Sequence, residues 1–288
     1  MLAPRVVGLV GFLVSLATLP RLHARALAAY FAKRTAHNDE GFFVDCRRGV
    51  WPNRIFRALP APPRCALCFQ PFSGIGRYLL GAKPSRKNPK VCDVCFARAP
   101  IGGHAMDIGV FFADVRGYTA LAEREGDAAT ARLLNRFYRV ATDVLVERFA
   151  IIDKLVGDEV MALFVPEFLT LGDRTCEIMV EAALALLNAV GYGGGAAWLP
   201  LGIGLHYGPA QVGNVGAGDV KDFTAIGDVV NTAARLQGVA KAGTVLLSDE
   251  VYARVGNRYP RARRSTVKVK GKRAPIPVHV LTLKGATT

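Results

Sequence analysis

The hydrophobic pattern divides the chain into a less regular N-terminal third and a regular remainder that starts near Asp107. Apolar residues over 127–148 recur at three- and four-residue spacing, which predicts an amphipathic helix, and residues 173–190 and 227–237 predict two more. Short apolar runs predict strands at 108–115, 149–156, 160–165, 199–205, 211–215, 223–226, 244–247, 267–270 and 278–283. Strands and helices alternate, so we expect an α/β fold in which helices flank a mostly antiparallel sheet.

Three segments of different composition precede this regular part. Residues 1–60 are apolar and then basic, residues 61–98 carry most of the cysteines, and residues 99–106 have the Gly and Pro content of a linker. The first apolar stretch has 15 residues between Arg5 and Arg21, whereas a membrane span needs about 20. Three interpretations stay open for this stretch, namely a short membrane anchor, a buried helix and a cleaved signal.

Positive charge is concentrated in the first hundred residues. They hold 16 Lys or Arg against 4 Asp or Glu, hence +12 of the total of +14, whereas the remainder holds 21 against 19. A solvated basic face is the simplest explanation. Because the basic residues follow an apolar segment and no nucleic-acid-binding motif accompanies them, we favour an anionic membrane surface as partner and expect no nucleic acid.

Four cysteines form two Cys-x-x-Cys knuckles with 23 residues between them: Cys65, Cys68, Cys92 and Cys95. Two such turns can place four thiolates around one ion, which is the tetrahedral shell that structural zinc prefers. An iron–sulfur cluster takes the same four ligands, and disulfides or a redox-responsive pair are further alternatives. Cys46 and Cys176 are predicted to be plain buried thiols.

Two acidic residues stand where predicted strands end. Asp114 follows the strand Phe111-Phe-Ala and precedes a Gly turn that enters a helix, while Asp158 occupies the tip of a predicted hairpin. Two Asp residues on neighbouring strand ends can share two divalent ions. Ligation by oxygen alone, together with phosphates, suits Mg²⁺ or Mn²⁺.

Two further motifs lie downstream. A glycine-rich segment over 202–216 contains His206, which we interpret as a structural histidine of a core strand rather than a general base. The segment 223–236 then carries Asn231 and Arg235, which are four residues apart and therefore lie on one face of a helix. They offer an amide and a fixed cation to the same ligand.

These four segments, in this order, resemble the catalytic domain of class III adenylyl and guanylyl cyclases over residues 107–284. The resemblance implies a ferredoxin-like core with extra strands. It also implies a head-to-tail homodimer with active sites at the interface. A cyclase of this kind would act as a cytoplasmic domain, tethered to the membrane if the N-terminus inserts.

The resemblance assigns roles in metal binding and catalysis. Asp114 and Asp158, with the backbone carbonyl of Val115, would bind two Mg²⁺ or Mn²⁺ ions in each active site. Asn231 would orient the ribose, and Arg235 would stabilise charge on the transferred phosphorus. The metal aspartates would come from one chain and the other residues from its partner.

Substrate contacts follow from the same resemblance. Lys154 would contact the adenine, Thr224 occupies the position that selects the base, and Lys270 would hold the terminal phosphates. Threonine at 224 resembles a subgroup of adenylyl cyclases, so we expect conversion of ATP to cyclic AMP and pyrophosphate. A guanylate cyclase and a catalytically inactive dimerisation or nucleotide-sensing module are the alternatives, whereas Val156 and Val160 do not fit the hairpin of diguanylate cyclases.

Overall fold

The computed structural model describes residues 63–74, 83–166, 174–217, 220–269 and 275–283. The predictions for residues 1–60, including the membrane anchor and Cys46, lie outside these ranges, as does Lys270. Within the ranges, every helix is too short or too polar to cross a membrane.

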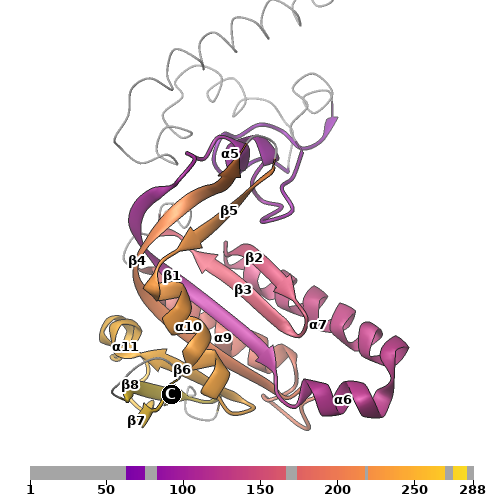
Figure 1. Cartoon of the computed structure of the whole chain (residues 1–288), viewed down its shortest axis with the longest axis vertical. Coiled ribbons are helices and arrows are strands. Elements are labelled where there is room, and N and C mark those ends of the chain that lie inside the picture. Colours follow the sequence, from indigo (N-terminus) through magenta and orange to yellow (C-terminus); the bar gives the residue numbers. More distant parts are fainter. Residues whose placement is uncertain (1–62, 75–82, 167–173, 218–219, 270–274, 284–288) are drawn as a thin grey trace, which may run out of the picture.

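An eight-stranded sheet forms the centre of the described part, in the order β2-β3-β1-β4-β6-β8-β7, and β5 pairs with β4 (Figure 1). The strands are β1 (His104–Val115), β2 (Ile151–Val156), β3 (Glu159–Phe164), β4 (Leu201–Ala217), β5 (Val220–Ile226), β6 (Thr244–Ser248), β7 (Arg263–Val267) and β8 (Ile276–Leu281). Only β4 and β6 pair in parallel among these strands. The mostly antiparallel sheet that the sequence predicts is confirmed.

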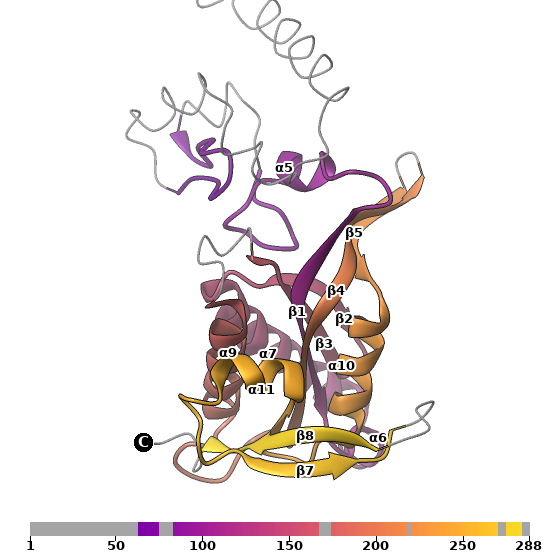
Figure 2. The same ribbon diagram turned by 90° about the vertical axis from the view of Figure 1, so that its left-hand side faces the viewer.

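Helices cover both faces of this sheet. They are α5 (Asp93–Ala97), α6 (Tyr118–Glu125), α7 (Asp127–Glu147), α9 (Thr175–Ala189), α10 (Asp228–Val239) and α11 (Asp249–Val255). Figure 2 shows α7, α9 and α11 on one face and α10 on the other. The predicted helices over 127–148, 173–190 and 227–237 are therefore confirmed to within a few residues.

The alternation of side chains along β1 builds two cores. Phe111 and Ala113 belong to the cluster that contains α7 and α9, whereas Ile108 and Val110 point the opposite way, to the cluster that contains α10. This second cluster also includes the cysteine knuckles and Phe96 of α5. The cysteine-bearing segment is thus packed against the α10 side of the sheet and shares its hydrophobic core.

One predicted break in the sheet is wrong. The sequence predicts two strands, over 199–205 and 211–215, but β4 runs from Leu201 to Ala217 without interruption and includes Pro209. On the edge that faces away from β1, β4 pairs with β6 over 202–205 and with β5 over 211–217. Pro209 therefore lies between the segments of β4 that pair with β6 and with β5. A missing backbone N–H is tolerated in such a gap.

The C-terminal elements also differ from the prediction. β7 covers Arg263–Val267, whereas the predicted strand starts at residue 267. The prediction missed it because this edge strand is charged and largely exposed and therefore has no apolar run in the sequence. α11 was not predicted, although Ser248 caps it by accepting a hydrogen bond from the N–H of Val251 at 3.4 Å. A Ser followed by two acidic residues is a helix-start signal that the sequence does carry.

Candidate active site

Two carboxylates, those of Asp114 and Asp158, come together where neighbouring strands of the sheet end. Asp114 is the penultimate residue of β1, and Asp158 occupies the turn between β2 and β3. The backbone N–H of Val115 donates to the carbonyl of Asp158 at 3.3 Å, and the side chain of Asp158 lies close enough to raise the pKa of Asp114. Gly157 has a φ of +60°, which lets the hairpin turn at this point. The structure therefore brings together the pair that the sequence predicts.

This pair is short of positive charge. Burial, together with the neighbouring Asp158, raises the pKa of Asp114 to about 7, although the cation of Arg116 acts in the opposite direction. The guanidinium of Arg116 donates to Asp114 Oδ2 at 2.5 Å and to the carbonyl of Gly238 at 3.3 Å. Two adjacent oxygen ligands with an unmet demand for cationic charge fit a hard divalent ion. Mg²⁺ and Mn²⁺ are therefore compatible with this donor set.

The two predicted base contacts meet at a third acidic residue, Asp153. Its side chain is 0% exposed and lies on β2 where the register with β3 shifts by one residue. Thr224 on β5 donates through Oγ1 to Asp153 Oδ2 at 2.9 Å. Lys154 Nζ lies 3.9 Å from the same oxygen, and its side chain is 54% exposed. Sequence reasoning missed Asp153, whose signal is a lone acidic residue within an apolar run.

The helix α10 carries the other two predicted residues. Asn231 is exposed and lies one turn before Arg235, which is 3.8 Å from the carboxylate of Asp228. In the described part of the chain, no hydrogen bond or ion pair joins either residue to Asp114 or Asp158. A single chain therefore presents two separate sets of predicted site residues.

The four knuckle cysteines form a compact cluster in which every sulfur lies within 4.8 Å of the others. Cys65 Sγ is 3.8 Å from Cys95 Sγ, and Cys68 Sγ is 3.6 Å from Cys92 Sγ. A zinc ion with bonds of about 2.3 Å to four tetrahedral thiolates gives sulfur separations of about 3.8 Å. The arrangement therefore fits a single tetrahedral ion, whereas a disulfide needs an S–S bond of about 2.0 Å.

Hydrogen bonds around these sulfurs favour a thiolate. The side chains of Cys68, Cys92 and Cys95 lower the pKa of Cys65, and the N–H groups of Cys68 and Cys92 also point to its sulfur, at 3.5 and 3.3 Å. Cys176 is different, because it is buried in the core and burial raises its pKa to about 12. This agrees with its prediction as a plain buried thiol.

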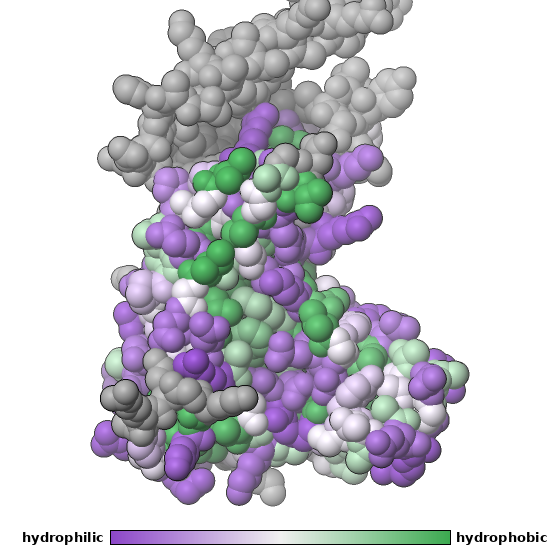
Figure 3. All heavy atoms as spheres, in the orientation of Figure 1, coloured by the Kyte–Doolittle hydropathy of each residue, from purple (hydrophilic) through white to green (hydrophobic). Residues whose placement is uncertain are grey.

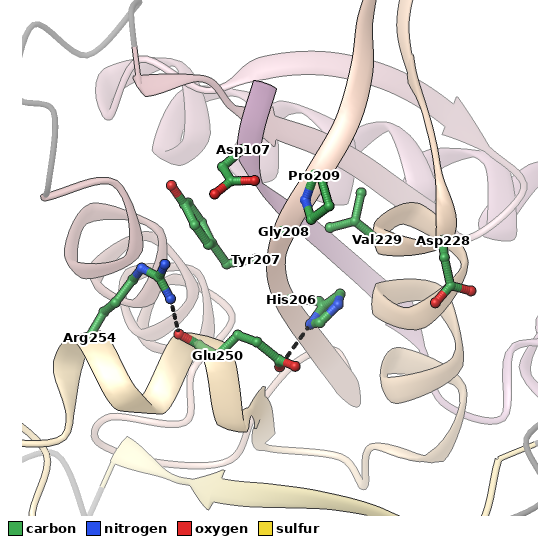
Figure 4. A pocket seen from close by; sticks show the side chains of 9 residues that line it. All are labelled: Asp107, His206, Tyr207, Gly208, Pro209, Asp228, Val229, Glu250 and Arg254. Atoms are coloured by element: carbon green, nitrogen blue, oxygen red, sulfur yellow. Dashed lines mark hydrogen bonds and ion pairs between the residues drawn. The ribbon is translucent and has the colours of Figure 1, made fainter. Parts of the chain in front are cut away.

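A cavity of about 400 Å³ lies elsewhere, between β4, α10 and α11 (Figure 4). His206 faces it and contacts Ser248 Oγ at 2.8 Å and the carboxylate of Glu250 at 3.4 Å. These partners tie β4 to the start of α11, as expected of a structural histidine. None of the predicted metal, base or ribose contacts lines this cavity.

Comparison with known proteins agrees with these observations. Residues 103–283 match the model of one protein family, the adenylate and guanylate cyclase catalytic domain. An adenylate cyclase of Anabaena cylindrica is 29% identical over 204 residues, which cover 63% of this chain and 39% of that protein. An uncharacterised protein of Mycobacterium tuberculosis is 32% identical over 195 residues, covering 64% and 35%. The match thus spans less than two fifths of either relative.

Solved structures support the fold. The guanylate cyclase domain of RhGC from Catenaria anguillulae, determined in complex with GTP, superposes with a TM-score of 0.53 at 22% identity. The superposition covers 62% of this chain and 98% of that domain.

Proposed function

We propose that this chain, which belongs to the adenylate and guanylate cyclase catalytic domain family, converts ATP to 3′,5′-cyclic AMP and pyrophosphate. Residues 107–284 would form the catalytic domain and residues 61–98 a metal-binding module. The observation that carries the proposal is the carboxylate pair of Asp114 and Asp158, which stands at the ends of neighbouring strands, where the N–H of Val115 donates to the carbonyl of Asp158 and the Asp158 side chain raises the pKa of Asp114.

Asp114 and Asp158, with the carbonyl of Val115, would hold two Mg²⁺ or Mn²⁺ ions. Bound there, the ions would supply Lewis-acid activation of the ribose 3′-hydroxyl and charge neutralisation of the leaving pyrophosphate. The raised pKa of Asp114 supports this assignment, because it reflects a site whose charge balance is incomplete without a cation.

Thr224 would select adenine through the direction of its hydroxyl group. Its single proton is donated to Asp153, so the oxygen has lone pairs but no proton left to offer a base. Adenine presents an amino donor at its six position, whereas guanine presents a carbonyl acceptor there. The acceptor character of Thr224 therefore supports ATP over GTP, and Lys154 would contact the same base.

The remaining roles require a second chain. Arg235 would stabilise the charge that develops on the phosphorus, and Asn231 would hold the ribose. Since neither contacts the carboxylate pair of its own chain, we propose a head-to-tail homodimer with shared active sites.

Exposed apolar side chains support such a dimer. They lie on β2, on the β4–β5 hairpin and at the end of α10: Leu155, Val156, Val215, Val220, Ile226 and Val239. Figure 3 shows apolar groups interspersed with polar ones down the middle of the face that is turned to the viewer. Burying such side chains against a second copy would stabilise the association.

Product analysis tests the proposal. The full chain, incubated with ATP or GTP and Mn²⁺, should form cyclic AMP from ATP in preference to cyclic GMP from GTP. The isosteric change Asp114→Asn should lower the rate by about 100-fold or more, while Asp143→Asn, an exposed position on α7, should leave it unchanged. Nucleotide binding without any product would instead indicate an inactive sensing module.

A further inference from the structure

The part of the loop between the two cysteine knuckles that contains Lys87 and Asn88 lies along the outer edge of β2. The carbonyl of Lys87 accepts a hydrogen bond from the N–H of Ile152 at 2.8 Å, and the buried side chain of Asn88 donates to the carbonyl of Ala150 at 2.8 Å. β2 is the last strand on its side of the sheet, so this loop pairs with an edge that would otherwise be open. The cysteine-bearing module is therefore docked beside the strand that carries Asp153.

The side chain of Lys87 reaches from this loop into the base-selecting region. Its Nζ donates to the carbonyl of Asp153 at 2.7 Å and to Asp153 Oδ1 at 3.3 Å, and it lies 3.0 Å from the carboxylate of Asp222. The other oxygen of Asp153, Oδ2, accepts the hydroxyl proton of Thr224. Lys87, Asp153 and Thr224 thus form one continuous chain of hydrogen bonds from the module to the nucleotide side of β5.

A second contact joins the same elements. The ring of Phe96 in α5 packs edge-on against Phe223, the neighbour of Thr224, with centroids 5.0 Å apart. Lys221 Nζ also donates to the carbonyl of Ala97 at 3.3 Å. The module therefore contacts β5 directly at Lys221 and Phe223, which precede the residue that would select the base.

We propose that Lys87 is a positioning residue for base selection. It holds the carboxylate of Asp153 in the orientation that accepts the Thr224 proton, and so keeps the hydroxyl oxygen as an acceptor toward the nucleotide. This inference rests on the proposed role of Thr224. Its consequence is that the cysteine module, and not only the cyclase domain, sets the preference between adenine and guanine.

Loss of the Lys87 charge would change how the carboxylate of Asp153 is held. Asp153 is fully buried, and its remaining nearby cation would be Lys154, on the Thr224 side of the carboxylate. A carboxylate drawn toward Lys154 no longer fixes the hydroxyl of Thr224. The hydroxyl is then able to rotate and donate to the carbonyl of guanine, which lowers discrimination.

The test compares Lys87→Met with Lys83→Met in the full chain. Both remove a lysine charge from the same loop, but the side chain of Lys83 is exposed. In Lys87→Met the ratio of kcat/KM for ATP to that for GTP should fall about tenfold, with the larger part of the change in KM. Lys87→Arg should restore most of the ratio, and Lys83→Met should keep the wild-type ratio.

A double-mutant cycle separates this role from a general loss of structure. In a Thr224→Val background, Lys87→Met should change the ratio by less than about twofold, because the hydroxyl on which it acts is gone. The isosteric change Asp153→Asn should lower the ratio even if Lys87→Met fails to fold. An unchanged ratio in both Lys87→Met and Asp153→Asn would overturn the inference.

Calorimetric affinities for ATP and GTP distinguish this inference from the proposed function. If the wild-type chain binds nucleotides but forms no product, the proposed reaction is wrong, whereas the ratio of the two dissociation constants still tests Lys87. A chain that forms cyclic AMP with the same selectivity in all variants contradicts the role of Lys87 alone. Failure to bind either nucleotide would overturn both.

Discussion

The carboxyl group of Asp158 lies close enough to that of Asp114 to raise its pKa, although the two residues come from different strand ends. One side chain, Arg116, provides a cation to this pair at 2.5 Å from Asp114. Such an arrangement does not serve stability, because two partly buried carboxylates repel each other when both are ionised. It serves a site that is completed by added positive charge.

Stability without divalent ions should therefore depend on pH through Asp114. The folded chain raises the pKa of this group from 3.8 to about 7, so folding is favoured by the bound proton. The stabilisation is fully present below about pH 4 and is lost as the pH rises to about 7. Asp114→Asn, which cannot ionise, should raise the melting temperature by about 5 °C at pH 8 and have little effect at pH 4.

Thermal unfolding in buffers without added divalent ions measures this difference. Asp143→Asn, at an exposed position of α7, is the matched control and should unfold like the wild type at both pH values. A lower melting temperature of Asp114→Asn at pH 8 would mean that the hydrogen bonds to Asp114 outweigh the repulsion from Asp158.

Much of this arrangement follows from local sequence. The strand that ends at Asp114 is an apolar run followed by a Gly turn, and Asp158 follows a glycine between two apolar runs, so both could be placed from neighbours in the chain. The contact between Lys87 and Asp153 could not, because 66 residues separate them. Nothing in the basic loop distinguishes Lys87 from its neighbouring lysines until the loop is docked on β2.

Arg235 should act on the rate more than on substrate binding. Arg235→Lys keeps the positive charge but loses the planar fork of donors, so kcat should fall by about 10- to 100-fold with a small change in KM. Arg132→Lys, at an exposed position of α7, should leave both constants unchanged. Steady-state kinetics with ATP and Mn²⁺ make the comparison, and an unchanged kcat in Arg235→Lys would remove Arg235 from the catalytic roles.

The cysteine cluster should hold about one zinc ion per chain. Cys92→Ser removes a ligand and should abolish stoichiometric zinc and lower the melting temperature, because the module shares the core on the α10 side. Cys176→Ser is the control. Cys176 lies in the other core, so this substitution should leave the zinc content unchanged. Elemental analysis measures both, and iron with visible absorbance would indicate an iron–sulfur cluster instead.

Shared active sites should allow two inactive chains to complement each other. Asp114→Asn and Arg235→Ala impair the two separate sets of residues, which a head-to-tail dimer would draw from different chains. A mixed dimer then has one site with both defects and one with neither. Because about half of randomly assembled dimers are mixed, co-expression should restore about a quarter of the wild-type activity. Asp114→Asn with Asp158→Asn is the matched control: both changes affect the same set, so every site in every dimer stays defective. Recovery in that control, or none in the first pair, would contradict sites that are divided between two chains.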